Sequence, residues 1–228
     1  MCGHQCGMLW GAALAGGAQA YRTYGRGPQA ETRAVLAARR LVATFRTQNQ
    51  YINCREIIGV SIDAPRGRDV LLFLAKSGFT GSCFGIAARY AKAAVRDLTA
   101  ARSDEDGQDP LSAPASCAAL LAQKLGASDL HTVMAAGLGG GIGLSGGACG
   151  ALGAAIWLAG MNAHDEAARP VGLKPTYVVD LMDRFTRCTG GEFECSKIAG
   201  TKFGSVGDHA AYLRAGGCAN VISALVGA

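Results

Sequence analysis

The sequence predicts an all-α fold made of two related small helical bundles, with cysteines at helix N-termini. Half of the 228 residues are hydrophobic, only 7% are aromatic and 33 are glycine, a composition that favours closely packed helices with small side chains. Apolar residues recur at helical spacing in several segments, whereas no alternating pattern lasts long enough to build a sheet. Three cysteine-centred segments also occur twice in the same order, which predicts the internal repeat.

The clearest helical pattern covers residues 30–47, where Val35, Leu41 and Phe45 fall on one face. Further helices are expected at 68–77, 84–101, 117–126, 128–137, 149–162, 176–188, 208–214 and 218–226. Residues 60–63 are compatible with one short strand. Residues 133–163 carry no charged side chain, but ten of them are glycine, which would loosen a lipid-exposed helix. A glycine-rich loop followed by a buried helix is therefore expected there, and a membrane span is not.

The repeat is carried by cysteines and their neighbours. Residues 1–17 align without gaps on residues 144–160, and residues 52–59 match residues 193–200. The alignment pairs three cysteines of each half: Cys6 with Cys149, Cys54 with Cys195, and Cys83 with Cys218. Three cysteines in one order, at similar intervals and with similar neighbours, indicate a duplicated unit.

The repeat divides the chain into three parts. Residues 1–103 form a first copy, residues 104–115 an acidic linker with Gly and Pro, and residues 116–228 a second copy. Cys117 has no counterpart in the first copy, which is therefore incomplete at its N-terminal end. Cys2 aligns with Ser145 and is an extra thiol that offers a fourth sulfur there.

Charge is distributed unevenly between the copies. Lys and Arg outnumber Asp and Glu by 14 to 5 in residues 1–103, and are outnumbered by 8 to 12 in the remainder. A basic half suits an acidic redox partner protein, or is simply a solvated face. No basic run with interleaved aromatic residues and no nucleic-acid motif is present, so a nucleic-acid partner is not expected. A homo-oligomer or a larger complex stays open, and the start lacks the basic region of a secretory signal, which favours the cytoplasm.

Each cysteine of the complete copy lies at or near an expected helix start: Cys117, Cys149, Cys195 and Cys218. Free amides and the positive dipole end stabilise an anion there, so a lowered thiol pKa is expected. Ser116 is a plausible N-cap before Cys117. If the four helix starts converge, they form a cage for a cluster held by several thiolates.

Other roles for the cysteines fit the sequence less well. Zinc sites usually contain a short Cys-x2–4-Cys pair, and the only close pair here is Cys2 and Cys6. Disulfides fit poorly with nine cysteines and no visible signal, while packing of buried thiols remains an alternative. Cys188 has no partner in the first copy and is expected to be a structural, buried cysteine.

Two further signals are weak. Residues 141–146 match G-x-G-x-x-G, but without a preceding strand they indicate a tight loop that presents amides to a cluster rather than a dinucleotide site. The four histidines are expected at the chain terminus or the surface, and none as a ligand: His4, His131, His164 and His209.

These residues carry a family resemblance. The succession of Cys117, Cys149-Gly150-Ala151, Cys195 and Cys218, with the glycine run before Cys149, resembles the C_GCAxxG_C_C family of redox-active proteins. That family is a small helical module similar to the iron–sulfur module of split-Soret cytochrome c, which implies a [2Fe–2S] cluster. Ala154 replaces the last Gly of the family motif, and in the first copy Met8 replaces its Ala.

The resemblance implies a cluster-ligand role for Cys117, Cys149, Cys195 and Cys218. In the first copy, Cys6, Cys54 and Cys83 match, with Cys2 as a fourth candidate, so a second cluster there is less well supported. We therefore expect an electron carrier, or a small subunit of a redox complex, that cycles single electrons. The alternatives are a metal-free thiol/disulfide enzyme or sensor, and a scaffold subunit whose cysteines only pack.

Overall fold

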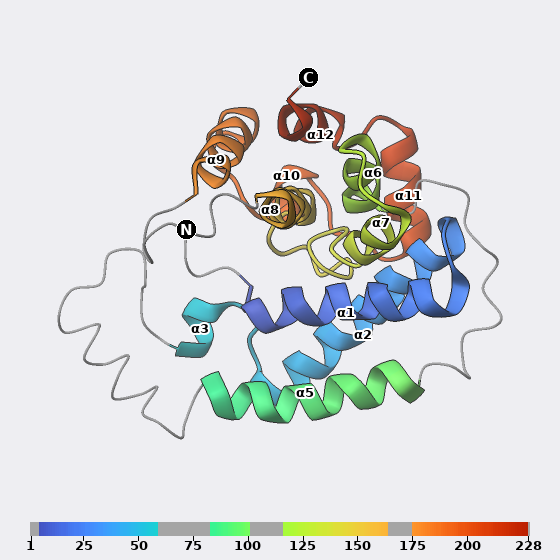
Figure 1. Ribbon diagram of the computed structural model, residues 1–228. Helices are drawn as coiled ribbons and strands as arrows, with labels where there is room; N and C mark the ends of the chain where they lie inside the picture. The colour runs from blue at the N-terminus through green and yellow to red at the C-terminus, as the bar shows by residue number, and fades with distance from the viewer. Residues whose placement is uncertain (1–4, 59–82, 101–115, 164–174, 228) are drawn as a thin grey trace, which may run out of the picture.

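The computed structural model describes residues 5–58, 83–100, 116–163 and 175–227. Within these residues the regular structure is helical, apart from two isolated β-bridges (Figure 1). The helices are α1 (Gly7–Tyr24), α2 (Pro28–Asn49), α3 (Cys54–Ile58), α5 (Cys83–Ala100), α6 (Cys117–Lys124), α7 (Asp129–Ala136), α8 (Gly150–Asn162), α9 (Thr176–Thr189), α10 (Cys195–Ile198), α11 (Val206–Arg214) and α12 (Ala219–Val226). The predicted all-α class is confirmed.

Most of the predicted helices are present, with ends displaced by a few residues: α2, α5, α6, α7, α8, α9, α11 and α12. The expected helix at 68–77, the short strand at 60–63 and the linker at 104–115 lie outside the described residues. Helices α1, α3 and the short α10 are not among the predicted helices. In α1 the cause is its composition, because Ala and Gly predominate and no charged residue precedes Arg22, so no polar face marks it as a helix.

The turn between α1 and α2 follows from glycine and proline. Gly25 and Gly27 take positive φ values of 73° and 101°, which residues with a Cβ rarely adopt. Pro28 then begins α2, at a position where its missing amide costs no helical hydrogen bond. The chain therefore reverses sharply, and α2 packs along α1.

Backbone hydrogen bonds confirm the repeat. The amide of Cys6 donates to the carbonyl of Ile52 at 2.7 Å, and the amide of Cys149 donates to that of Phe193 at 2.8 Å. These two bonds occupy equivalent positions in the alignment. The two isolated bridges are equivalent as well, since one joins the residues just before Cys6 and Cys54 and the other those before Cys149 and Cys195.

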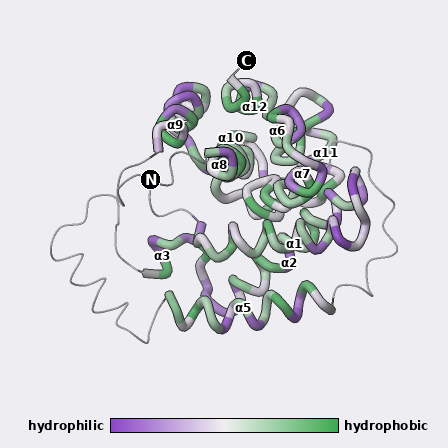
Figure 2. Tube along the Cα trace, in the orientation of Figure 1, coloured by the Kyte–Doolittle hydropathy of each residue, from purple (hydrophilic) through white to green (hydrophobic). Residues whose placement is uncertain are grey.

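The two copies share one hydrophobic core. In Figure 1, α1, α2 and α5 form the lower layer, and the helices of the second copy lie above them. Helix α1 packs on α7, where Gly17 lies against the backbone of Met134. The indole ring of Trp10 covers Gly153 of α8. In Figure 2, hydrophilic residues are concentrated on α9 at the outside, whereas α1 is neutral or hydrophobic along most of its length.

Among the described residues, no helix combines the length and the apolar character needed to cross a membrane.

Candidate functional site

Four helices of the second copy begin at the predicted cysteines. Cys117 and Cys195 are the first residues of α6 and α10, and Cys149 and Cys218 are the N-caps of α8 and α12. Ser116 is fully buried, and its Oγ accepts a hydrogen bond from the amide of Ala119 at 3.5 Å, which confirms its capping role. We call Cys117, Cys149, Cys195 and Cys218 the second-copy thiols.

The fold gathers the second-copy thiols into one neighbourhood. The side chains of Cys117 and Cys218 are hydrogen-bonded to each other. The charge of Cys117 acts on Cys149, and the charges of both act on Cys195. Cys117, Cys149 and Cys195 are buried, and Cys218 is half-buried at the edge of the group. Segments up to 101 positions apart in the chain therefore supply sulfur atoms to one region.

The expected lowering of the thiol pKa is wrong for Cys117, Cys149 and Cys195. The hydrogen bond with Cys218, together with burial, raises the pKa of Cys117 to about 12. Burial raises the pKa of Cys149 to about 12, although the amides of Leu152 and Ala151 act in the opposite direction. Burial also raises the pKa of Cys195. The helix starts do offer amides, but the loss of water and the nearness of other sulfurs outweigh them.

His209 is the residue of this site that the sequence did not reveal. It was expected at the surface, yet it is fully buried in α11. Its imidazole lies beside the thiol of Cys117 and acts to lower the pKa of that thiol. The ring lies 4.7 Å from the ring of Phe203, centroid to centroid. Its spacing from Val206 and Leu213 places His209 on the apolar face of α11, and this was the available signal.

Cys188 is also misplaced by the sequence prediction, because it is exposed rather than buried. It lines an open groove of about 450 Å³ together with Cys218, Lys197 and Tyr212. Its charge acts on Cys149. Gly217 lets Tyr212 approach, since a Cβ there would overlap the phenol ring. The groove connects the half-buried edge of the second-copy thiols with solvent.

The glycine-rich loop does not present its amides to the thiols as expected. The amides of Ile142 and Gly143 donate to the carbonyls of Leu138 and Gly137, and the amide of Gly146 donates to Gly140. Most of the loop residues from 140 to 146 have positive φ. The loop therefore satisfies its amides internally and uses its glycines for close packing, as at Gly143, where a Cβ would overlap the backbone of Arg39.

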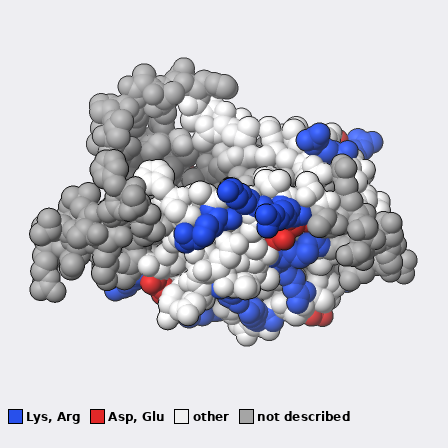
Figure 3. All heavy atoms as spheres, turned by 90° about the horizontal axis from the view of Figure 1, so that it is seen from below, with Lys and Arg blue, Asp and Glu red and all other residues white. Residues whose placement is uncertain are grey.

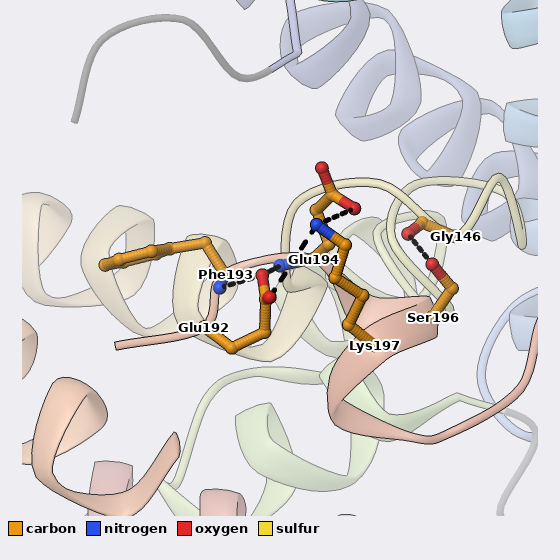
Figure 4. A network of polar contacts seen from close by, with 6 residues as sticks. All are labelled: Gly146, Glu192, Phe193, Glu194, Ser196 and Lys197. Atoms are coloured by element: carbon orange, nitrogen blue, oxygen red, sulfur yellow. Dashed lines mark hydrogen bonds and ion pairs between the residues drawn. The ribbon is translucent and has the colours of Figure 1, made fainter. Parts of the chain in front are cut away.

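Carbonyls of this loop instead hold the start of α10. The amide of Cys195 donates to Gly147 at 2.6 Å, and Ser196 donates to the carbonyl of Gly146 through its amide at 3.1 Å and its hydroxyl at 3.0 Å. The side-chain bond between Ser196 and Gly146 is drawn in Figure 4. Cys195 is thereby fixed to the segment that precedes Cys149.

A carboxylate shapes the segment that leads into Cys195 (Figure 4). One oxygen of Glu192 accepts the amides of Phe193 and Glu194 at 2.7 and 2.8 Å. Lys197 pairs with Glu194 at 3.0 Å and with Glu192 at 3.7 Å. The hydrogen bonds from these two backbone amides fix the backbone just before Cys195, while the ion pairs are exposed and weaker.

The first copy has a partial equivalent of this site. Cys6 is the N-cap of α1, and Cys54 and Cys83 begin α3 and α5; we call these three the first-copy thiols. Cys6 is buried, and burial together with the charge of Cys83 raises its pKa against the effect of the amide of Met8. Cys2 lies outside the described residues. The described part of the first copy contains no counterpart of α6.

The kind and arrangement of the possible ligands indicate which metal group would fit this site. Within the described ranges, no three His, Cys, Asp or Glu side chains are arranged to hold a single metal ion. A [2Fe–2S] cluster instead takes two protein ligands on each iron. The hydrogen-bonded pair of Cys117 and Cys218 and the buried Cys149 and Cys195 fit that requirement in donor chemistry.

Comparison with known families gives one match. The family model described as "Putative redox-active protein (C_GCAxxG_C_C)" matches residues 1–96 and again residues 113–227. No curated protein and no solved structure matches the chain significantly.

Proposed function

Because the chain belongs to the C_GCAxxG_C_C family of redox-active proteins, with two matching regions in tandem, we propose that it is an iron–sulfur electron carrier. In this proposal the second-copy thiols hold one [2Fe–2S] cluster. When bound, such a cluster accepts and releases one electron at a time. The carrier would act alone or as a small subunit of a redox complex.

The observation that carries the proposal is the gathering of the second-copy thiols in a buried place. Thiolate charges would repel one another there, which is part of the reason that the pKa values of Cys149 and Cys195 are raised. A bound cationic group removes this penalty, because coordination deprotonates thiols outright. Cys117, Cys149 and Cys195 are costly to ionise alone and are well suited to ionise together around iron.

Neighbouring side chains would adapt the protein to such a group. The imidazole of His209 stabilises negative charge on the sulfur of Cys117. The amides of Ala151 and Leu152 do the same for Cys149. Burial excludes water from three of the four sulfurs, and the groove at Cys218 leaves one edge open to a partner.

An acidic redox partner suits the charge of the first copy. Arg89, Lys92 and Arg96 are exposed at helical spacing on α5. Figure 3 shows Lys and Arg gathering on the lower face of the molecule, where Asp and Glu are sparse. Such a face favours transient, electrostatically steered encounters with an acidic protein.

One observation favours a second candidate, a metal-free thiol/disulfide enzyme or sensor. Cys188 is exposed in the same groove that Cys218 lines, so two thiols are open to a disulfide substrate. This candidate requires no iron and predicts a colourless protein with reactive thiols.

The test is chemical analysis of anaerobically purified protein. The iron–sulfur proposal predicts a brown protein with about two iron and two acid-labile sulfide per occupied cluster. Cys117→Ser should remove or shift the visible spectrum, whereas Cys188→Ser should leave it unchanged. A colourless protein without iron or sulfide, also after anaerobic reconstitution, would falsify the proposal and favour the thiol candidate.

A further inference from the structure

Helix α5 turns large apolar side chains toward solvent along one face. Phe84 is 84% exposed and Val95 is 62% exposed, more than any other large hydrophobic residue in the described part of the chain. Two exposed alanines lie between them on the same face, so that the apolar residues recur at positions i, i+4, i+7 and i+11: Phe84, Ala88, Ala91 and Val95. We call these four residues the α5 stripe. A contiguous exposed row of this kind is typical of an interaction surface.

The opposite face of α5 fixes the helix to the first copy. Ile86, Tyr90 and Ala94 are buried on that face. The hydroxyl of Tyr90 donates to the carbonyl of Leu41 in α2 at 3.1 Å, and its ring packs edge to face on Phe45. In Figure 1, α5 lies at the bottom of the molecule, with α1 and α2 above it. The α5 stripe therefore points away from the core, and no described helix covers it.

A row of cations borders the α5 stripe. Arg89, Lys92 and Arg96 are exposed on the adjoining face at positions i, i+3 and i+7, and we call them the cation row. None of the three forms an ion pair with a described acidic residue. Asp97, the one acidic residue of α5, instead accepts a hydrogen bond from the hydroxyl of Thr44 in α2. Figure 3 shows that Lys and Arg gather on the lower face, while Asp and Glu are sparse there. A complementary partner therefore brings carboxylates.

We propose that the α5 stripe and the cation row are the docking site for an amphipathic helix of a partner protein that carries acidic side chains beside its apolar ones. The two alanines let such a helix approach closely between Phe84 and Val95, while its carboxylates meet the cation row. A second copy of this chain is a poor occupant, because Asp97 is turned toward α2 and leaves the cation row without a carboxylate. A lipid surface would gain little from alanines between the two bulky side chains. The purpose of docking rests on the proposed electron-carrier function, whereas docking itself requires no iron.

Docking is tested with metal-free, reduced protein, so its failure is distinguished from the absence of a cluster, which iron and sulfide analysis decides. The probe is a fluorescently labelled synthetic peptide of the length of α5, 18 residues, with leucine at the spacing of the α5 stripe, glutamate along one flank and alanine elsewhere. A second peptide has lysine in place of each glutamate. Fluorescence anisotropy should show saturable binding of the glutamate peptide that weakens as salt is added. The lysine peptide should bind at least about tenfold more weakly.

Matched pairs of variants identify the surface that binds the glutamate peptide. Val95→Glu should weaken binding at least about tenfold, because docking would bury its carboxylate. Val179→Glu makes the same change at an exposed valine of α9 and should leave binding unchanged. Lys92→Glu should weaken binding about threefold or more, whereas Lys124→Glu, the same charge change at an exposed position of α6, should not. Circular dichroism checks that the four variants fold. Absence of saturable binding, or an equal loss in a variant and its control, overturns the proposal.

Cross-linking locates the bound peptide. A carbodiimide joins a glutamate of the peptide to a lysine of the protein through an amide bond and is itself converted to a urea by the water removed. Mass spectrometry should place the main link on Lys92, and a main link on any other lysine overturns the proposal. Wild-type binding to vesicles of phosphatidylcholine and phosphatidylglycerol that Val95→Glu abolishes would make this face a lipid site. A wild-type dimer that Val95→Glu breaks would make it an interface between copies. Either result overturns the proposal.

Discussion

The indole ring of Trp10 packs on Gly153, the very residue that the repeat aligns with Trp10. A position that meets its own counterpart lies where the two copies touch. The largest side chain on one side therefore faces the smallest residue on the other, and the two copies differ where they touch. This asymmetry shows that the duplicated halves have adapted to each other rather than remaining two independent modules.

Gly17 gives the first prediction, because it brings α1 onto α7. A Cβ at this position would overlap the backbone of Met134, which cannot move aside as a side-chain end can. We predict that Gly17→Ala lowers the free energy of unfolding by about 1–3 kcal/mol. Gly11→Ala in the same helix is the control, and it should raise that free energy by up to about 1 kcal/mol, because Gly11 has open space around it. Urea unfolding checks both, and equal effects would contradict the close approach.

Glu192 gives the second prediction, because one of its oxygens accepts the two amides before Cys195. Glu192→Ala leaves both amides without this acceptor and should lower the free energy of unfolding by about 1–2 kcal/mol. Glu192→Gln keeps an acceptor oxygen while losing the ion pair with Lys197, so it should retain most of the stability. Urea unfolding of the two variants separates the roles. If both variants lose the same amount of unfolding free energy, then the ion pair with Lys197 holds this segment, and the hydrogen bonds from the two backbone amides do not.

Tyr90 gives a prediction about pH. Its hydroxyl donates to the carbonyl of Leu41 at 3.1 Å, and burial, with the nearby charges of Asp97 and Cys6, raises its pKa well above the ordinary value. Above about pH 10 the unfolded chain loses the phenol proton while the folded chain keeps it, so stability falls as pH rises.

The decline attributable to this one group is at most about 1.4 kcal/mol per pH unit. Tyr90→Phe should therefore show a shallower loss of stability than wild type between pH 10 and pH 11.5, measured by urea unfolding at each pH. Below pH 9 the two curves should run parallel. If stability falls with pH at the same rate in wild type and Tyr90→Phe above pH 10, then the pKa of Tyr90 is the same in the folded and the unfolded chain, which would contradict the prediction.

The sequence predicted the parts of this fold that have a local cause. Amphipathic segments such as residues 30–47 became helices, and the spacing of cysteines identified the repeat. Helix α1 was not predicted, because its exposed face is made of Gly and Ala and gives no alternation of polar and apolar residues. The ligand roles of the thiols and the boundaries of the copies stay predictions, as the linker lies outside the described residues.

The errors at the site share one cause, which is burial. The helix starts were found, but whether a thiol there is ionised depends on the water and the sulfurs around it, which only the tertiary structure decides. The same holds for His209, whose core position is set by Phe203 and Cys117, and for Cys188, whose exposure is set by how α9 packs. The glycine-rich loop was expected to donate hydrogen bonds from its amides to the thiols. Instead, the carbonyl of Gly147 accepts a hydrogen bond from the backbone amide of Cys195.

His209 gives the last prediction, which concerns the iron-loaded protein. Its imidazole lies beside the sulfur of Cys117 and favours negative charge on that sulfur, and hence the reduced state. A polar interaction of the strength of a net hydrogen bond contributes about 1 kcal/mol, which corresponds to roughly 40 mV for one electron. His209→Leu should therefore lower the reduction potential by roughly 20–60 mV, while His209→Gln, which retains a donor, should change it less. His131→Gln is the control, because the ring of His131 packs edge to face with that of Trp157, away from the thiols. Anaerobic redox titration monitored by visible absorbance measures the shift. A His209→Leu protein that keeps its iron and has the wild-type potential would show that this histidine fills space without acting on the sulfur.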